Sequence, residues 1–344
     1  MNKKRNAVEW AMHYRQIIIL VVCCLVAFGI YSLPNMRKNE FPDFTIRQGI
    51  VVAVAPGNTA EEMVEQVAKP LENYIFSYKE VKKDKTFSMS RDEFAAYLES
   101  VRITGEVATP RENNLDHIQG FLDGNEHLEF GVQWTREWDY DSVFEVMVRR
   151  AGLNPDRSHT HGQDTIGAEQ CISALEEYAR IFGEAVRAGS RILFATGHPA
   201  GLFPMYAVMA AAAKAAGAEV LQIEEGERFL DGDVRQIMDV VMFEQYGNLQ
   251  HTHFPGPMRI ALDQLKARGV TPDLVVSDHG MAGYASSTCK LLTIGIADCN
   301  DPGLFVAAEQ GDLPVCVPMD DNVPPRRYEP MIDFILDRAG LERP

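Results

Sequence analysis

From residue 191 onward, short runs rich in β-branched residues alternate with helical patterns, and this alternation constrains the fold more than any other feature of the chain. Strands are predicted at 192–196, 219–223, 240–244, 249–252, 274–277, 293–297 and 315–318. Helices are predicted at 92–101, 167–188, 202–216, 256–267, 302–310 and 328–339. We therefore expect an α/β fold with a doubly wound, mostly parallel sheet and right-handed crossovers.

Histidines and aspartates follow the carboxyl ends of several predicted strands. The segments are Thr196-Gly197-His198-Pro199-Ala200-Gly201, His251-Thr252-His253, Ser277-Asp278-His279-Gly280, Asp298-Cys299-Asn300-Asp301 and Asp320-Asp321-Asn322. In an open parallel sheet the carboxyl ends lie along one edge, and ligands bind in the crevice outside them. The pattern therefore predicts an active crevice lined by His198, His251, His253, Asp278, His279 and Asp298.

Imidazole and carboxylate groups in one crevice favour a divalent metal. The expected metal ligands are His251, His253, Asp278, Asp298 and Asp301. His251 and His253 are two residues apart, so on a strand both side chains point to the same face. Histidine with carboxylate suits Zn²⁺ or Mn²⁺, whereas a carboxylate-rich set favours Mg²⁺ or Mn²⁺. The sequence therefore predicts a divalent metal and leaves its identity open.

The same crevice offers groups suited to a phosphate. Gly197 and Gly201 flank the turn that opens a helix, where free backbone N–H groups favour an anion. Arg111 and Asn114 could also contact a substrate phosphate. An anion cradle beside a metal that activates water predicts hydrolysis of a phosphate ester. The catalytic residues expected are Asp278, His279 and His198.

These residues also have simpler structural explanations. Helix capping is the alternative for Asp278, Asp298 and Asp301. A role in a turn or a polar strand end is the alternative for His198, His251, His253, Asp320 and Asp321. Solvation in a polar loop is expected for His159 and His161, and packing behind a strand is expected for Cys299.

Two other classes of function stay open. The turn from Gly197 to Gly201, between a strand and a helix, is similar to the turn of a dinucleotide-binding fold. Its spacing is G-x-x-x-G rather than G-x-G-x-x-G, and His198 crowds the backbone approach that the motif needs. A non-enzymatic module that binds a metal or an anion is the second alternative. Metal-dependent turnover would separate a phosphatase from both, and a spectral shift with nicotinamide cofactor would single out an oxidoreductase.

The N-terminal part differs from the rest in charge. Residues 1–90 carry 12 Lys and Arg against 9 Asp and Glu, whereas residues 91–344 carry 21 against 40, and the formal net charge is −16. Such an acidic surface argues against nucleic-acid binding through a broad basic face. None of the six cysteines forms a C-x-x-C pair, so neither a zinc ribbon nor a thioredoxin-like site is predicted.

Residues 17–33 form an apolar run without a charge. A bilayer core of ~30 Å needs about 17–25 helical residues, so the run is just long enough to span it. Basic residues in front of the run predict a single pass through the inner membrane, with the N-terminus in the cytoplasm. A signal peptide and a buried core helix are the alternatives. The isolated catalytic domain is expected to be soluble.

The residues after this run predict a strand at 45–55 and a helix that begins after Thr59. The stretch 32–76 has the sequence SLPNMRKNEFPDFTIRQGIVVAVAPGNTAEEMVEQVAKPLENYIF. It resembles the start of resistance-nodulation-division efflux permeases, and the resemblance covers about residues 5–90. It implies a first transmembrane helix and the opening βα unit of a porter domain. No second apolar run follows, so this chain by itself is not expected to transport.

The motifs of the remaining chain resemble, in order, a bacterial family, common in actinobacteria, known simply as phosphatases. They are VATPRENN, GQDTI, LFATGHPAGL, HTH, VVSDHGMAG, IADCNDPGLF and PMDDNV, within about residues 92–341. The resemblance implies that the chain acts on a small phosphorylated substrate. We therefore expect a tail and transmembrane helix (1–37), a truncated porter-like fragment (38–90) and a phosphatase-like catalytic domain (91–344), which the lipid bilayer tethers through the apolar run.

Overall fold

The computed structural model describes Tyr14, Gln16, Ile19 and residues 87–344. The chain divides into two units, Met1–Lys82 and Lys83–Pro344, and the fold below is that of the second unit. The predicted strand 45–55, the helix after Thr59 and, apart from Ile19, the apolar run 17–33 lie outside the described residues. Within the described residues, no helix combines the length and the apolar character that crossing a bilayer requires.

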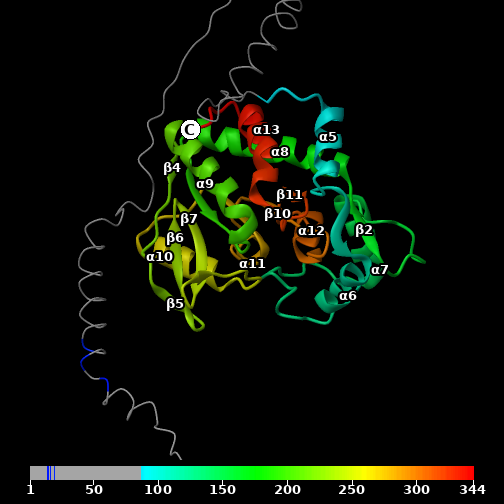
Figure 1. Cartoon of the computed structure of the whole chain (residues 1–344), viewed down its shortest axis with the longest axis horizontal. Coiled ribbons are helices and arrows are strands. Elements are labelled where there is room, and N and C mark those ends of the chain that lie inside the picture. Colours follow the sequence, from blue (N-terminus) through cyan, green and yellow to red (C-terminus); the bar gives the residue numbers. More distant parts are fainter. Residues whose placement is uncertain (1–13, 15, 17–18, 20–86) are drawn as a thin grey trace, which may run out of the picture. The chain divides into compact units, whose positions relative to one another are not determined.

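The second unit contains both helices and strands, which alternate along most of the chain, although β4 to β8 follow one another without a helix (Figure 1). The helices are α5 (Arg91–Ser100), α6 (Arg111–Leu122), α7 (Tyr140–Ala151), α8 (Ala168–Arg187), α9 (Pro199–Ala215), α10 (Gly256–Ala267), α11 (His279–Gly283), α12 (Pro302–Glu309) and α13 (Glu329–Ala339). The strands are β1 (Gly105–Pro110), β2 (Gln163–Ile166), β3 (Arg191–Ala195), β4 (Glu219–Val220), β5 (Glu227–Phe229), β6 (Gly232–Ile237), β7 (Val240–Gln245), β8 (Asn248–Leu249), β9 (Leu274–Asp278), β10 (Thr293–Ala297) and β11 (Val315–Pro318). A π-helix (Tyr284–Thr288) continues α11, and a 3₁₀ turn (Pro325–Tyr328) precedes α13.

The larger sheet has nine strands, and its central part is parallel. The order is β11-β10-β9-β3-β7-β6-β5, and β4 also pairs with β3. All pairs from β11 to β7 are parallel, whereas β5, β6 and β8 extend the β7 edge in antiparallel fashion. The expected mostly parallel sheet is therefore found at the centre, and the antiparallel hairpin of β5 and β6 is an addition that the sequence pattern did not predict.

The chain changes direction across the sheet next to β3. After β3 it passes through α9 to β4 on one side, and after β7 it crosses through α10 to β9 on the other side. Ligands bind at such a switch point, outside the carboxyl ends of the strands. The ends of β3 and β9 lead directly into His198 and His279, so the topology brings these two histidines to the same crevice.

Helices cover both faces of the sheet, as a doubly wound fold requires (Figure 1). On one face, α8, α9 and α13 pack against strand residues that include Phe194 and Val276. On the other face, α10 and α11 pack against Leu193 and Val275. Successive side chains of a strand point to opposite faces, so each strand supplies both layers.

A second, two-stranded sheet of β1 and β2 packs with α6, α7 and α12 in a separate apolar cluster. It contributes to the crevice through Thr109, whose hydroxyl donates a hydrogen bond to Asp298 Oδ2 at 2.7 Å.

One predicted strand is wrong. The pattern indicated a strand at 249–252, but β8 ends at Leu249. The Gln250 N–H still donates to the Phe243 carbonyl of β7 at 2.8 Å, but the Thr252 N–H donates to the Gly197 carbonyl at 2.8 Å instead of to a strand.

Candidate functional site

The first part of the site is the sharp turn after β9, where Asp278 and His279 are both buried. His279 has a φ of 48°, a left-handed conformation that costs a non-glycine residue about 1–3 kcal/mol and is concentrated at functional sites. Asp278 Oδ1 accepts hydrogen bonds at 2.7 Å from the Gly197 N–H and from His279 Nδ1. Asp278 therefore fixes the orientation of the His279 ring.

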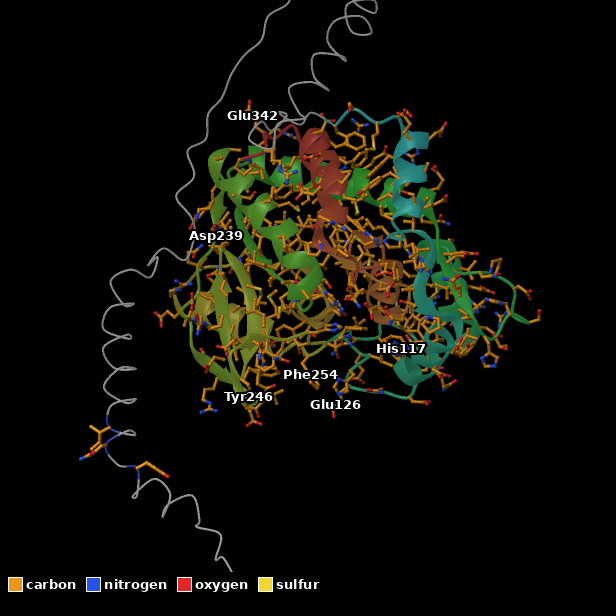
Figure 2. The ribbon with its side chains drawn as sticks, in the orientation of Figure 1. His117, Glu126, Asp239, Tyr246, Phe254 and Glu342 are labelled. Atoms are coloured by element: carbon orange, nitrogen blue, oxygen red, sulfur yellow. The ribbon has the colours of Figure 1, made fainter. Side chains whose placement is uncertain are left out.

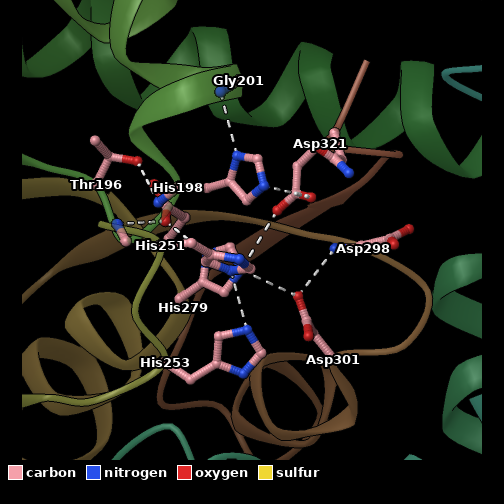
Figure 3. Close-up of polar contacts among 12 residues, drawn as sticks. Thr196, His198, Gly201, His251, His253, His279, Asp298, Asp301 and Asp321 are labelled. Carbon is pink, nitrogen blue, oxygen red and sulfur yellow. Dashed lines mark hydrogen bonds and ion pairs between the residues drawn. The ribbon is translucent and has the colours of Figure 1, made fainter. Parts of the chain in front are cut away.

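The His251-Thr252-His253 segment is held against this turn by its backbone. A Cβ at position 280 would collide with the His253 carbonyl oxygen, so the close approach requires Gly280. Although the segment is not a strand, its two imidazoles still point toward His279 (Figure 3).

Three imidazole nitrogens converge at the centre of the site. His251 Nε2 lies 3.0 Å from His253 Nε2 and 3.2 Å from His279 Nε2. His253 Nδ1 faces the His127 carbonyl at 2.7 Å, and His279 Nδ1 faces Asp278. Both partners are acceptors, so both rings carry a proton on Nδ1 and present the Nε2 lone pair to the centre. A divalent cation satisfies lone pairs that face one another in this way.

All three imidazoles are neutral at physiological pH. Burial, together with the neighbouring imidazoles, lowers the pKa of His251, His253 and His279 to about 3. The neutral ring is the form that binds a metal, because the proton and the metal compete for the same nitrogen.

Asp301 and Asp321 approach the same group of nitrogens. The Oδ2 atoms of Asp301 and Asp321 lie 3.7 Å and 3.5 Å from His279 Nε2. Asp321 is buried, and its Oδ2 has no hydrogen-bond partner among the described residues. A buried oxygen without a donor is costly, which makes this atom a candidate cation ligand.

Asp298 and Asp320 continue the cluster on the side of Asp321. The Cys299 N–H donates to Asp298 at 2.6 Å, in addition to the Thr109 hydroxyl. Such donors fix the orientation of carboxylates at metal sites. The candidate ligand atoms fall into three sets, each with all its atoms within 4.8 Å: His251, His253 and His279; His279, Asp301 and Asp321; and Asp298, Asp320 and Asp321.

Asp278, Asp298, Asp301 and Asp321 hold their protons more tightly than usual. Burial, followed by repulsion between the carboxylates, raises the pKa of Asp298 to about 6 and those of Asp301 and Asp321 well above the usual range. Burial also raises the pKa of Asp278 to about 6. Within the described part of the chain, the ion-pair partners of these carboxylates are histidines, and none is a lysine or an arginine.

His198 has the opposite tautomer. Its Nδ1 accepts a hydrogen bond from the Gly201 N–H at 3.2 Å, so Nε2 carries the proton. This Nε2 lies 4.0 Å from Asp321 Oδ1 (Figure 3). Burial lowers the pKa of His198, so at neutral pH the ring is an uncharged hydrogen-bond donor.

The expected phosphate cradle is corrected by the structure. The Gly197 N–H donates to Asp278, and the Gly201 N–H donates to His198, so neither is free for an anion. A Cβ at position 201 would collide with the Asp321 carbonyl oxygen, and the two glycines instead permit close packing of the strand ends. The same contacts remove the basis for a dinucleotide-binding turn.

The expectation for Arg111 and Asn114 is corrected as well. Both are buried, and both donate to Asp164 Oδ2, at 2.8 Å and 3.0 Å. Arg111 Nε and Nη2 donate to the His159 and Asp156 carbonyls at 2.9 Å and 3.2 Å. Each of the three guanidinium nitrogens therefore has a partner within the protein, and the fully buried side chain forms an ion pair with Asp164 rather than a contact for a phosphate.

The structure brings four of the five predicted metal ligands into the three sets, and it adds residues that were not predicted as ligands. His251, His253, Asp298 and Asp301 belong to the three sets. Asp278 belongs to none of them and contacts His279 instead. His279, Asp320 and Asp321, which we did not predict as ligands, belong to the sets. The signal for the last two was their position directly after the buried strand β11.

A pocket of about 540 Å³ opens beside the histidines, with His251 and His253 in its wall. Its lining is a mixture of polar and aromatic side chains that includes Asn125, His117 and Phe254. Figure 2 labels the last two of these. Its volume falls in the range of small-molecule sites, about 300–1,000 Å³.

An α/β fold with a buried histidine and aspartate cluster at the switch point of its sheet has the architecture of a small-molecule enzyme. The chain belongs to the Phosphatase family, which residues 89–343 match. Phosphatase SCO2771 from Streptomyces coelicolor is 46% identical over 259 residues, which cover 74% of this chain and 97% of that protein. The family match begins at residue 89 and does not bear on the efflux-permease resemblance of about residues 5–90.

Proposed function

We propose that the chain is a metal-dependent phosphatase that hydrolyses small phosphate monoesters at the switch point of its sheet. The observation that carries the proposal is the convergence of the His251, His253 and His279 Nε2 atoms, at 3.0 Å and 3.2 Å. Membership of the Phosphatase family and the name of the Streptomyces coelicolor relative support the reaction.

The donor set fits a divalent cation that accepts both nitrogen and oxygen, such as Zn²⁺ or Mn²⁺. His251, His253 and His279 would hold it, with Asp301 or Asp321 as a further ligand. When bound, such an ion polarises a phosphoryl oxygen and lowers the pKa of water. Asp278 orients His279, which makes it a positioning residue rather than a ligand.

The proposed reaction converts an ester and water into an alcohol and phosphate. The oxygen of water bonds to phosphorus while the ester P–O bond breaks, and the leaving oxygen takes up a proton equivalent to the one that water loses. The His198 Nε2–H is suited to donate a hydrogen bond to a phosphoryl oxygen.

The pocket beside His251 and His253 is suited to the leaving group of the substrate. Its lining contains no lysine or arginine among the described residues, so it offers no partner for a second phosphate. Asp116 lines it as well and would repel a further negative charge. We therefore infer a monoester whose alcohol part is uncharged.

The test is hydrolysis of p-nitrophenyl phosphate by the full chain, stripped by a chelator and resupplied with Mg²⁺, Mn²⁺ or Zn²⁺. We expect one of these ions to restore turnover. His251→Ala should lower the restored rate by about 10²-fold or more, since a lost ligand weakens a contribution of several kcal/mol. His161→Ala, in an exposed loop, is the matched control and should keep the rate. Turnover that survives chelation, or a His251 variant as active as the control, would refute the proposal.

We also propose that residues 17–33 attach the catalytic domain (91–344) to the inner membrane by a single pass, with residues 38–90 between them. The support is the apolar run and its basic flank. The test is fractionation of cells that express the full chain, with extraction at pH 11. An anchored chain stays in the membrane pellet, and a chain found in the supernatant would refute this part.

A further inference from the structure

The three ligand sets extend beyond the reach of a single ion. They form a continuous series, because His279 belongs to the first and second sets and Asp321 to the second and third. An ion on the three histidines uses only one end of this series. Asp298 and Asp320, at the other end, would then keep their negative charges unneutralised.

Asp321 joins the two ends. Its Oδ2 lies 3.5 Å from His279 Nε2, whereas its Oδ1 lies 4.0 Å from His198 Nε2. The carboxylate is buried, with an exposed fraction of 4%, and Oδ2 has no hydrogen-bond partner among the described residues. Because Asp321 supplies a ligand atom both to the set with His279 and to the set with Asp298, its carboxylate can contact a cation at each end.

The other two aspartates are oriented but not neutralised. Asp298 accepts from Thr109 and from the Cys299 N–H, and Asp320 Oδ1 accepts from the Asn322 N–H at 2.9 Å. A carboxylate offers about four lone-pair positions, so each of them keeps positions free for a cation. The donors are uncharged, so they hold the carboxylates in place without cancelling their charge.

The count of charges leads to the same conclusion. Five buried carboxylates lie in or beside the cluster: Asp278, Asp298, Asp301, Asp320 and Asp321. None pairs with a lysine or an arginine among the described residues. Cations that bind here replace the protons that these carboxylates otherwise hold, and a phosphate substrate brings further negative charge. Each divalent ion offsets two negative charges, so two ions balance the deprotonated cluster better than one.

We propose that the cluster binds two divalent cations, one on the histidines His251, His253 and His279 and one on the aspartates Asp298 and Asp320, with Asp321 as their shared ligand. This inference rests on the proposed phosphatase function and deepens it. In a two-cation site the ions together stabilise the attacking and the leaving oxygens of a displacement at phosphorus. The shared carboxylate is the residue on which that arrangement depends.

The test is the number of Mn²⁺ ions bound per full chain, from elemental analysis after equilibrium dialysis. We expect two ions in the wild type and one in the double variant Asp298→Asn with Asp320→Asn. Asn keeps the shape and an acceptor oxygen, and circular dichroism checks the fold. The control pair Asp141→Asn with Asp263→Asn, at positions outside the cluster, should keep two ions. Saturation of the wild type at one ion, or two ions in the cluster variant, would overturn the proposal.

A second measurement keeps the test valid if the double variant does not fold. Two Mn²⁺ ions that share a carboxylate couple magnetically, so the wild type should give the electron paramagnetic resonance spectrum of a coupled pair. A spectrum of isolated ions would overturn the proposal. One ion together with chelator-sensitive hydrolysis would refute the pair alone, whereas chelator-insensitive hydrolysis would refute the proposed function.

Discussion

The buried carboxylates of this chain lie in two kinds of environment, which shift their pKa values in opposite directions. Asp164 is completely buried and accepts hydrogen bonds from Arg111, from Asn114 and from backbone N–H groups. Burial opposes its ionisation, but these donors outweigh burial and lower its pKa. Asp301 and Asp321 are almost as buried, receive no such cationic partner among the described residues, and have pKa values well above the usual range.

The difference separates stability from function. Around Asp164 the chain provides its own counter-charge, so that carboxylate stabilises the fold. At the switch point of the sheet the chain gathers carboxylates and supplies only neutral imidazoles, which leaves the counter-charge to an external cation. Local destabilisation of this kind is typical of functional sites.

The largest effect on stability is expected from breaking the buried ion pair between Arg111 and Asp164. Arg111→Met leaves the Asp164 carboxylate buried and unpaired, which should lower the free energy of unfolding by about 3–5 kcal/mol. Urea denaturation measures the change. Arg180→Met, which removes exposed ion pairs with Glu177 and Glu184, is the matched control and should leave the free energy of unfolding nearly unchanged. Similar losses of unfolding free energy in the two variants would show that the buried pair of Arg111 and Asp164 is no more stabilising than an exposed ion pair.

The next effect concerns the positioning of His279. Asp278→Asn offers the His279 ring an amide in place of a carboxylate, so the Nδ1 proton is held less firmly and the Nε2 lone pair is less well aimed. We expect the fold to persist and the affinity for Mn²⁺ or Zn²⁺ to fall by about 10–100-fold, with most turnover lost at limiting metal. Titration calorimetry measures the affinity. An unchanged metal affinity would show that Asp278 does not position the ring.

A smaller effect on the free energy of unfolding should have opposite signs in the two environments. A carboxylate with a raised folded pKa contributes stability that is fully present below its unfolded pKa and is lost as the pH rises through the folded pKa. In metal-free protein at pH 8, Asp321→Asn should therefore raise the free energy of unfolding by about 1–2 kcal/mol. Asp164→Asn should lower it, because Asp164 is stabilising as an anion. Changes of the same sign in both variants would contradict the comparison.

The smallest effect is a pH dependence that belongs to the aspartates alone. The three imidazoles have pKa values of about 3, so they hold no proton between pH 5 and pH 8. Asp298 has a pKa of about 6, so below pH 6 its proton competes with a cation. The rise in melting temperature on adding Mn²⁺ should grow by about 2–4 °C from pH 5 to pH 7. This pH-dependent increase should be smaller in the Asp298→Asn with Asp320→Asn variant, where only Asp301 and Asp321 still exchange protons for a cation. An increase as large as that of the wild type would assign it to other groups.

The sequence predicted the parallel part of the fold well, because buried strands and amphipathic helices differ in period. The predicted helix 256–267 agrees with α10, and the strands 293–297 and 315–318 agree with β10 and β11. The edge hairpin of β5 and β6 was missed because its short strands alternate charged residues with few apolar ones, so the local pattern does not distinguish them from a loop.

The sequence predicted the site residues that lie near strand ends. It did not predict those whose role depends on a partner far away in the sequence. His251 and His253 were found from their spacing, although the segment is not a strand. Arg111 was misassigned because its partner, Asp164, lies 53 residues away and nothing local indicates the pair. Asp321 was weighed as a turn residue because prolines follow it, and its shared position became visible only in three dimensions.

The hydrogen bond from His253 Nδ1 to the His127 carbonyl ties the histidine cluster to the segment between α6 and α7. His127 and His253 both line the 540 Å³ pocket, so the ring that faces the cluster also sets one dimension of the cavity. Occupancy of the cluster and occupancy of the pocket are then thermodynamically coupled. By reciprocity, whatever factor an ion adds to the affinity for an alcohol group, that group adds to the affinity for the ion. Where the alcohol raises the affinity for the ion, a higher chelator concentration is needed to empty the cluster when product alcohol occupies the pocket.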